Sequence, residues 1–473
     1  MTHRPHTSPK GGYDLAVIGA GAAGFSAAIT AAEQGAQVAL IGHGTIGGTC
    51  VNVGCVPSKT LIRAAEAVHQ AHTASRFEGL RAEGRLVDWR ALVRQKDALV
   101  ASLRQEKYKD LLPRYETLNY LEGPARLADN GVVVNGDLIQ AAKLVIATGA
   151  RPALPAIAGI EDVPALTSTT AMELEFLPKS LLVIGGGYIG CEQAQMFARL
   201  GVEVTLTCRS RLLPSAEPEI SEALTHCLVE EGIAVRCGLT YRSLARTGDG
   251  IAFTVLEDEK TQTITTERLL VATGRTPNTG GLGLKEAGIA LNRDGTIRVD
   301  NHMQTSQPNI YAAGDVTGLN LFVYMAAYGA GIAAKNALGD TRSYNNHAMP
   351  WVVFTDPQVA GVGWTEAEAR ARGHETRISV LPLDRVPRAL AARDTRGLIK
   401  LVADAPTNRL LGAHILAPEG ADSIQTAALA IRHNLTIADL TDMIFPYLTT
   451  VEGLKLAALA FDRDVTKLSC CAV

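Results

Sequence analysis

The sequence is poor in aromatic residues and has no marked excess of one charge. Aromatic residues make up 5% of its 473 residues, and 45 Lys and Arg nearly balance 48 Asp and Glu, which leaves a formal net charge of -3. Such a chain offers no basic field for nucleic acid and no polybasic patch for a membrane surface. No apolar run approaches the ~20 residues of a membrane helix, and residues 1–10 lack the apolar stretch of a secretory signal. We therefore expect a cytoplasmic protein that binds neither nucleic acid nor membranes.

Cysteine is also scarce, but its positions are informative. Eight cysteines in 473 residues are too few for a disulfide scaffold, and a reducing compartment does not favour structural disulfides. Cys50 and Cys55 lie close together near the N-terminus, and Cys470 and Cys471 are adjacent near the C-terminus. Such pairs indicate redox or metal chemistry. The other four are expected to be buried as small apolar residues: Cys191, Cys208, Cys227 and Cys237.

What the sequence does contain is hydrophobic residues (47%) in short runs that alternate with glycine turns. A strand at 14–18 leads into Gly19-Ala-Gly-Ala-Ala-Gly24, and a helix at 25–34 and a strand at 37–41 follow. In this context Gly19, Gly21 and Gly24 let the backbone approach a pyrophosphate, which would lie at the helix N-terminus. The alternative is a simple tight turn. The complete strand–turn–helix–strand order favours a dinucleotide site.

The same pattern occurs again about 166 residues later. A strand at 180–184 leads into Gly185-Gly-Gly-Tyr-Ile-Gly190, followed by a helix at 192–199 and a strand at 202–207. Gly185, Gly187 and Gly190 take the three glycine positions. The repetition predicts two separate dinucleotide-binding domains of Rossmann type.

Both units lack the acid that normally follows the second strand and binds the ribose hydroxyls. Gly42 has that position in the first unit, and Cys208 has it in the second. Arg209 and Arg211 follow Cys208, and two guanidinium groups suit a 2′-phosphate, which favours NADPH over NADH. The alternative for these arginines is a solvated surface position.

Further strands are expected at 144–149, 269–274 and 309–315, the last of which ends on an acid. From about residue 349 the pattern changes to strands at 352–354, 397–402 and 411–416 and helices at 423–433 and 453–460. About three domains suit the length. The fold class predicted is α/β, with two Rossmann-like domains and a C-terminal α+β domain.

The segment 47–59 (Gly-Gly-Thr-Cys-Val-Asn-Val-Gly-Cys-Val-Pro-Ser-Lys) carries the N-terminal cysteine pair. Cysteines five apart at a helix start can bring their sulfurs within bonding distance, and the positive helix end favours the reactive thiolate. The alternatives are a buried structural pair of cysteines or half of a metal site. The combined sequence of this block is too specific to favour either.

With the two glycine turns, this block resembles the pyridine nucleotide–disulfide oxidoreductases, and the resemblance extends from Tyr13 to the end of the chain. It implies FAD in the first site and NAD(P)H in the second. It also implies that Cys55 is the charge-transfer thiolate nearest the flavin and Cys50 the interchange sulfur. Glu192 is expected to pair with Lys59, and Tyr188 to gate the nicotinamide pocket. Contacts to FAD are implied for Thr49, Lys59, Gly24, Gly44, Ala125, Asp315 and Val323.

The resemblance also implies an order of domains. An FAD-binding domain (12–152 and 278–347) is interrupted by an NADPH-binding domain (153–277), and a C-terminal dimerisation domain (348–473) follows. Because Tyr13 already opens the first nucleotide unit, we expect a catalytic core without an N-terminal metal-binding domain.

The C-terminal domain indicates which branch of the family is involved. The disulfide-reducing members use a His-Pro motif with a Glu five residues after the His, but Phe445 and Thr450 take these positions here. Neither residue transfers a proton near neutral pH. This argues against a lipoamide- or glutathione-type substrate.

The ending Lys467-Leu-Ser-Cys-Cys-Ala-Val473 resembles the mercury(II)-reducing members instead. Thiolates are soft ligands for soft metals. The resemblance implies that Hg(II) arrives as a thiolate complex, binds Cys470 and Cys471 of one subunit and passes to Cys50 and Cys55 of the other. A homodimer with a shared active site is therefore expected. Tyr108 and Tyr447 would line the metal path, although ordinary packing is an alternative for Tyr108.

Two other functions stay open. One is an oxidoreductase acting on another disulfide, and the other is a non-catalytic metal-binding or redox-sensing flavoprotein. Consumption of NADPH on addition of Hg(II) would distinguish them.

Overall fold

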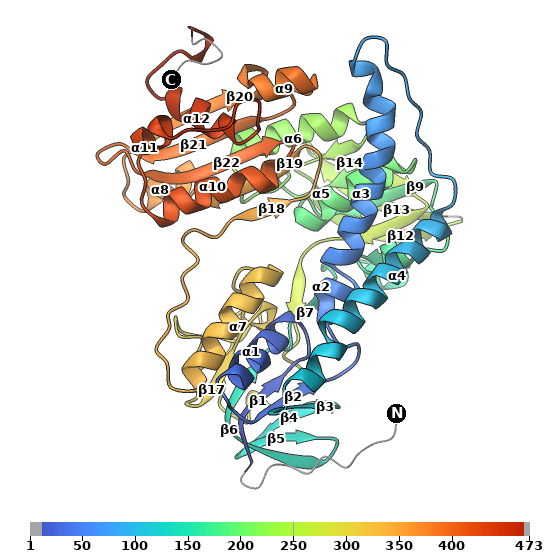
Figure 1. Ribbon diagram of the computed structural model, residues 1–473. Helices are drawn as coiled ribbons and strands as arrows, with labels where there is room; N and C mark the ends of the chain where they lie inside the picture. The colour runs from blue at the N-terminus through green and yellow to red at the C-terminus, as the bar shows by residue number, and fades with distance from the viewer. Residues whose placement is uncertain (1–11, 249, 468–473) are drawn as a thin grey trace. The chain divides into compact units, whose positions relative to one another are not determined.

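The computed structural model describes residues 12–248 and 250–467. Its contacts divide the chain into two compact units, shown in Figure 1. Among the described residues, the first unit comprises 12–58, 91–153 and 275–345, and the second comprises 59–90, 154–248, 250–274 and 346–467. Neither matches one predicted domain, and the predicted four-range division stays a prediction.

The first unit is built on a sheet with the strand order β3-β2-β1-β6-β5-β4, in which β17 also pairs with β6. Its strands β3, β2, β1, β6 and β17 are joined in parallel, while β4 and β5 form an antiparallel extension of β6. Every residue of β2 is buried, as expected for a strand covered on both faces. The strands are β1 (Tyr13–Ile18), β2 (Val38–Gly42), β3 (Leu118–Glu122), β4 (Ala125–Ala128), β5 (Gly131–Val134), β6 (Asp137–Ile146) and β17 (Ile310–Ala312).

Helices α1 (Ala22–Glu33) and α7 (Val323–Ala337) share one hydrophobic core with this sheet. Both are rich in alanine and glycine, whose small side chains allow their backbones to approach closely. The unit also contains α2 (Gly48–Asn52), the start of α3 (Cys55–His72), most of α4 (Trp89–Lys107), and the short ribbon of β7 (Ala150–Pro152) and β16 (Arg275–Pro277).

The second unit contains a parallel sheet of order β11-β10-β9-β15-β8 and an antiparallel sheet of order β12-β13-β14. Helix α5 (Tyr188–Arg199) connects β9 to β10, and α6 (Pro218–Glu230) connects β10 to β11. The strands are β8 (Ala165–Thr167), β9 (Ser180–Ile184), β10 (Glu203–Thr207), β11 (Ala234–Arg236), β12 (Thr240–Thr247), β13 (Gly250–Glu257), β14 (Lys260–Thr266) and β15 (Arg268–Val271).

The C-terminal part of the second unit is an antiparallel sheet of order β18-β19-β22-β21-β20 with its own hydrophobic core. The strands are β18 (Trp351–Val353), β19 (Gln358–Gly363), β20 (Thr376–Pro382), β21 (Leu398–Asp404) and β22 (Leu410–Ala417). The helices are α8 (Glu366–Ala371), α9 (Pro387–Ala392), α10 (Gly420–Arg432), α11 (Ile437–Asp442) and α12 (Glu452–Leu459).

The α/β fold class with a C-terminal α+β part is confirmed, and the strand predicted at 180–184 has these bounds in β9. Two helix starts were wrong. Helix α1 begins at Ala22 and not at 25, and α5 begins at Tyr188 and not at 192, because each helix starts directly after the middle glycine of its turn. No helix among the described residues is long and apolar enough to cross a membrane.

Candidate functional site: two glycine turns, a cysteine pair and a nucleotide pocket

The two glycine turns have the same geometry. Gly19 and Gly185 have positive φ values (119° and 125°), which glycine adopts without strain. A Cβ on Gly24 would lie 1.6 Å from the Gly19 carbonyl oxygen, and one on Gly190 would lie 1.8 Å from that of Gly185. The third glycine of each turn therefore allows helix and strand to meet, which is the role this position has in dinucleotide turns.

Both helix starts offer donors to a ligand. The N-cap residues of α1 and α5 are Gly21 and Gly187, and neither cap has a side-chain hydrogen bond. The first backbone N–H groups of each helix thus remain for another acceptor. A Cβ on Gly187 would meet nothing within 4 Å, so the space outside the turn is open. These features fit the pyrophosphate of a dinucleotide at each turn.

The cysteine block packs directly on the first turn. The Gly47 N–H donates to the Ala20 carbonyl oxygen at 2.8 Å, and a Cβ on Gly48 would lie 2.6 Å from the Gly21 Cα. Thr49 and Cys50 follow within α2, and Asn52 holds this short helix by donating to the carbonyl oxygens of Ile46 and Gly48. These contacts place α2, the short helix that contains Cys50, against the dinucleotide turn.

Cys55 is the first residue of α3 and is exposed, whereas Cys50 is half-buried. The positive end of an 18-residue helix favours a thiolate at Cys55. Tyr108 lies near this pair: burial and then the negative charge of Cys50 and Cys55 raise the pKa of Tyr108. Its ring packs edge-on against Phe25 of α1, with ring centroids 4.9 Å apart. Tyr108 therefore keeps its proton beside the two sulfurs.

The position of Gly42, where an acid is normally found, is filled from the neighbouring strand. A Cβ at this position would lie 2.5 Å from the Tyr120 hydroxyl oxygen, so the Tyr120 side chain occupies the space that a larger residue would need. Burial raises the pKa of Tyr120, and the negative charge of Glu122, two residues along β3, raises it further. The end of β3 thus presents a phenol and a carboxylate next to the position without an acid.

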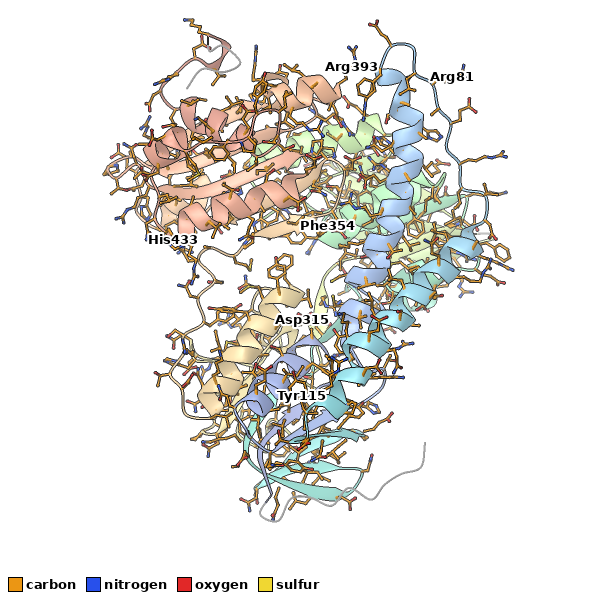
Figure 2. All side chains as sticks on the ribbon, in the orientation of Figure 1. Arg81, Tyr115, Asp315, Phe354, Arg393 and His433 are labelled. Atoms are coloured by element: carbon orange, nitrogen blue, oxygen red, sulfur yellow. The ribbon has the colours of Figure 1, made fainter. Side chains whose placement is uncertain are left out.

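The remaining residues predicted to contact FAD in the first unit lie at strand ends and helix starts. Asp315, labelled in Figure 2, follows β17 and lies 3.2 Å from the Nε of Arg275. Burial raises the pKa of Asp315, and Arg275 opposes this rise. Val323 is the first residue of α7, and Ala125 is the first of β4. Gly44 has a φ of 82° and open space at its Cβ position.

In the second unit, Lys59 and Glu192 form an ion pair with Nζ and Oε2 2.6 Å apart. Glu192 is buried, and its other oxygen accepts the Phe354 N–H at 2.9 Å. Lys59 also lies 5.0 Å from the centroid of the Phe354 ring, which Figure 2 labels. Tyr188, the first residue of α5, stacks on Trp351 with ring centroids 5.6 Å apart. Sequence reasoning missed Phe354, because nothing in the sequence joins it to Glu192.

The two arginines after β10 differ. Arg209 is exposed. The Nη2 of Arg211 donates to the carbonyl oxygens of Pro214 and Ala216 at 2.9 and 2.8 Å, while its buried Nη1 has no hydrogen-bond partner. An unpartnered buried guanidinium nitrogen beside the second glycine turn fits a phosphate ligand.

Two protein-family models match the chain. Residues 13–336 match the pyridine nucleotide-disulphide oxidoreductase model, and residues 349–458 match the dimerisation domain of the same family. The chain belongs to the pyridine nucleotide-disulphide oxidoreductase family. It is therefore an oxidoreductase of a family that uses flavin and pyridine nucleotide, and it carries the family's dimerisation domain.

Curated relatives in the family include several mercuric reductases. The protein from Staphylococcus aureus is 49% identical over 98% of this chain and 85% of its own length. The one from Streptomyces lividans is 48% identical over 98% of both chains. Among solved structures, a Cu(II) complex of the HOCl-induced flavoprotein disulfide reductase RclA from Escherichia coli is 31% identical, with a TM-score of 0.84 over 94% of this chain and 99% of that one.

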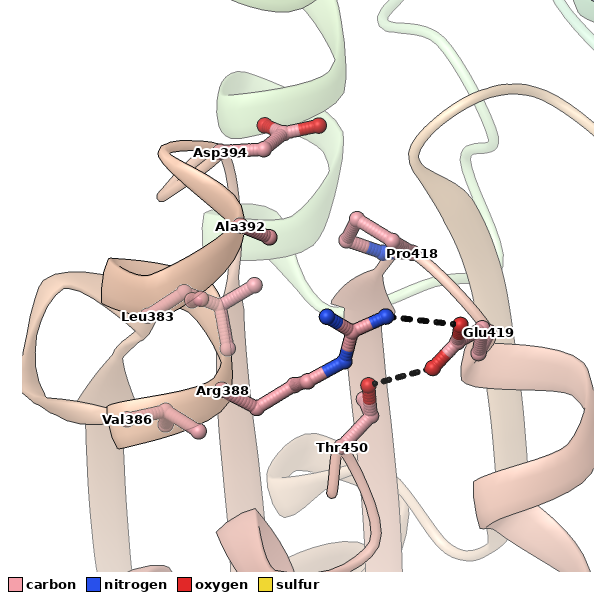
Figure 3. A pocket seen from close by; sticks show the side chains of 9 residues that line it. Leu383, Val386, Arg388, Ala392, Asp394, Pro418, Glu419 and Thr450 are labelled. Atoms are coloured by element: carbon pink, nitrogen blue, oxygen red, sulfur yellow. Dashed lines mark hydrogen bonds and ion pairs between the residues drawn. The ribbon is translucent and has the colours of Figure 1, made fainter. Parts of the chain in front are cut away.

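The C-terminal domain lacks the family's acid/base pair at the predicted positions. Phe445 packs against the hydrophobic core of this domain. Thr450 is buried, and its hydroxyl donates to Glu419 at 3.1 Å, as Figure 3 shows for a small surface pocket that Arg388 also lines. Tyr447, between the two, is 47% exposed.

The predicted tail cysteines, Cys470 and Cys471, lie outside the described residues. Within residues 12–248 and 250–467, no group of three or more His, Cys, Asp or Glu side chains is arranged to hold a metal ion.

Proposed function

We propose that the protein is an FAD-containing, NADPH-dependent reductase that converts Hg(II) to Hg(0). One observation carries the choice of substrate: an oxidoreductase cysteine pair is built on the first glycine turn, while Phe445 and Thr450 stand where disulfide-reducing members have a proton-transferring His and its Glu. Exchange of Hg(II) between thiolates needs no proton transfer. The similarity to mercuric reductases supports the same choice.

The residues of the first unit would hold FAD. Gly19, Gly21 and Gly24 shape the turn, and the uncapped N–H groups of α1 would donate to the pyrophosphate. Thr49, Gly44, Ala125, Asp315 and Val323 are the further contacts proposed. When bound, FAD supplies a two-electron carrier between NADPH and the Cys50–Cys55 disulfide.

The second glycine turn would bind NADPH. Gly185, Gly187 and Gly190 allow the backbone to approach the pyrophosphate, and Arg209 with the unpartnered nitrogen of Arg211 would bind the 2′-phosphate. Tyr188 would cover the nicotinamide pocket. Lys59, which pairs with the buried carboxylate of Glu192, is a further contact proposed for FAD.

Metal transfer follows from ligand exchange. We propose that Cys470 and Cys471 take Hg(II) from a small thiol and pass it to Cys50 and Cys55. Each exchange forms one sulfur–metal bond and breaks another, so charge is conserved without an acid or base. Tyr108 keeps its proton because burial and the cysteine thiolates raise its pKa, and Tyr447 would present a second phenol to the metal. A second NADPH would supply, through the flavin when it is bound, the two electrons that reduce the bound Hg(II), and Hg(0), which has little affinity for thiolate, leaves.

We propose a homodimer in which each tail serves the cysteine pair of the partner. The chain carries the family's dimerisation domain, and this domain exposes a run of apolar side chains. These are Met443 (42% exposed), Ile444 (93%), Tyr447 (47%) and Leu448 (43%). An exposed apolar run of this kind favours burial against another subunit. The reaction suits the cytoplasm, a reducing compartment.

The test uses the purified protein with NADPH, Hg(II) and excess thiol, followed at the NADPH absorbance band. Turnover with Hg(II), and none with lipoamide or oxidised glutathione, is expected. Disulfide turnover without Hg(II) turnover would support the disulfide-reductase alternative, and no turnover with flavin bound would support a binding or sensing role. A Cys470→Ala/Cys471→Ala variant should keep flavin and its reduction by NADPH but lose turnover of thiol-bound Hg(II), and unchanged turnover would exclude the tail's proposed role.

A further inference from the structure

Two cysteines outside the proposed redox site meet at the edge of the second nucleotide fold. Cys208 directly follows β10 and Cys237 directly follows β11, and these strands pair in parallel with Thr207 opposite Arg236. The Cys208 thiol donates to the Cys237 sulfur at 3.2 Å. Cys191, Cys208 and Cys227 are buried as predicted, but the prediction was wrong for Cys237, which is half-buried because it follows β11, the edge strand of the sheet.

The backbone holds this pair on both sides. The Cys208 N–H donates to the Arg236 carbonyl oxygen at 3.0 Å, and the Leu239 N–H donates to the Cys208 carbonyl oxygen at 3.2 Å. The Gly238 N–H donates to the Ser210 carbonyl oxygen at 2.9 Å. The two sulfurs therefore face each other across a continuous ladder and not across two independent loops.

The two thiols differ in acidity. The hydrogen bond from Cys208, and then one from the Leu212 N–H, lower the pKa of Cys237 to about 7 although burial opposes this. The same contact and burial raise the pKa of Cys208. Cys191 and Tyr241 are the other titratable groups whose charges interact with these sulfurs. A partly accessible thiolate with a second thiol behind it is the arrangement that oxidation-sensitive cysteine pairs share.

The pair is coupled to the nucleotide site by direct contact. A Cβ on Gly186, in the second glycine turn, would lie 2.9 Å from the Cys208 Cβ, and the Gly186 carbonyl oxygen accepts the Leu213 N–H at 2.7 Å. The segment from Cys208 to Leu213 also carries Arg209 and Arg211. A disulfide requires the sulfurs to approach from 3.2 Å to about 2.05 Å, so this segment has to shift.

We propose that a peroxide oxidises Cys208 and Cys237 to an intramolecular disulfide, and that this disulfide weakens binding of NADPH at the second glycine turn. The Cys237 thiolate attacks the peroxide, the O–O bond breaks, and a sulfenic acid forms with release of hydroxide or alkoxide. The Cys208 thiol then attacks the sulfenic sulfur, and the S–S bond forms as water leaves. The two sulfurs give up two electrons to the peroxide. Two equivalents of a small thiol reverse the reaction.

This switch rests on the second nucleotide site and not on the identity of the final electron acceptor. The purified FAD-loaded protein is treated with hydrogen peroxide, remaining thiols are alkylated, and tryptic peptides are analysed without reduction. Cleavage after Arg199, Arg209, Arg236 and Arg242 places Cys208 in peptide 200–209, Cys237 in peptide 237–242 and Cys191 in a third peptide. A cross-link between 200–209 and 237–242 is expected, and it should disappear after treatment with dithiothreitol.

Affinity is measured with NADP+, which binds without reducing the flavin. Oxidation should raise the Kd for NADP+ at least tenfold in the wild type, and leave it unchanged in Cys237→Ser and Cys237→Ala. Cys227→Ser is the matched control, since Cys227 is buried in α6 of the same unit, and this variant should respond as the wild type does. Absence of the cross-link after peroxide treatment, or a cross-linked protein with unchanged affinity for NADP+, would overturn the proposal. None of these readouts uses Hg(II), so the result does not depend on the proposed substrate.

Discussion

Replacing the third glycine of each turn should separate the two nucleotide sites. In Gly190→Ala the new Cβ would lie 1.8 Å from the Gly185 carbonyl oxygen, against the ~3.3 Å of a close C···O contact, so the turn has to open by about 1.5 Å. Such a shift removes the alignment of the first N–H groups of α5 with a phosphate. Two lost charge-assisted hydrogen bonds, at roughly 1.5–3 kcal/mol each, correspond to a loss of about 10²–10⁴ in affinity.

The assay for Gly190→Ala is the Kd of NADP+, together with flavin absorbance of the purified protein. Flavin should remain bound, while binding of NADP+ weakens by at least a hundredfold. The matched control is Gly201→Ala. Gly201 follows the end of the same helix, has a φ of 95° and has open space at its Cβ position, so the substitution strains the backbone without a clash. This control should cost roughly 1–2 kcal/mol in backbone strain but leave the Kd for NADP+ within twofold.

Gly24→Ala is the reciprocal experiment. Its Cβ would lie 1.6 Å from the Gly19 carbonyl oxygen, so the protein should purify without flavin, whereas the Gly35→Ala control should purify yellow. If Gly190→Ala released the flavin and Gly24→Ala kept it, the assignment of FAD to the first turn and NADPH to the second would be wrong.

Three further predictions concern single contacts. Lys59→Met should lower the stability of the second unit in urea by about 1–3 kcal/mol, because it leaves the buried Glu192 carboxylate without its cation. Adding Glu192→Gln should recover part of this loss. An equal loss of stability in the single and double variants would contradict the pairing. Gly42→Glu should lower FAD affinity because the new side chain clashes with Tyr120, and the double variant Gly42→Glu/Tyr120→Ala should restore the affinity. Tyr115 lies outside that contact, so restoration by adding Tyr115→Ala would count against the steric explanation. Burial raises the pKa of Tyr241 to about 12 against an ordinary value near 10, so the unfolded state loses its proton first and stability falls as pH rises from 10 to 12. Urea titrations should show a shallower fall for Tyr241→Phe, and an identical slope would refute this origin.

The sequence predicted those parts of the site that depend on local pattern. A glycine turn between a strand and a helix is specified by residues a few positions apart, so both turns, the bounds of β9 and the position of the cysteine block after β2 follow from the sequence. The two helices begin three or four residues before their predicted starts, because the glycine turn and not the apolar spacing determines the first helical residue.

Contacts between distant positions could not be predicted in this way. The Phe354 N–H reaches Glu192 across 162 residues, and Tyr120 fills the space at Gly42 only because β2 and β3 pair. Likewise, Cys208 and Cys237 meet because β10 and β11 are neighbours in the sheet, which spacing along the chain does not reveal. Strand order, which determines these contacts, arises from the packing of the whole unit.

Whether thiol-bound Hg(II) is the electron acceptor can be measured by following the metal and the cofactor at the same time. Purified protein with NADPH and excess thiol is given Hg(II), while NADPH absorbance and release of volatile Hg(0) are recorded together. We predict one Hg(0) for each NADPH oxidised, with no activity in Cys50→Ala or Cys55→Ala variants that retain flavin. Oxidation of NADPH without release of Hg(0), or equal activity in those variants, would contradict the account.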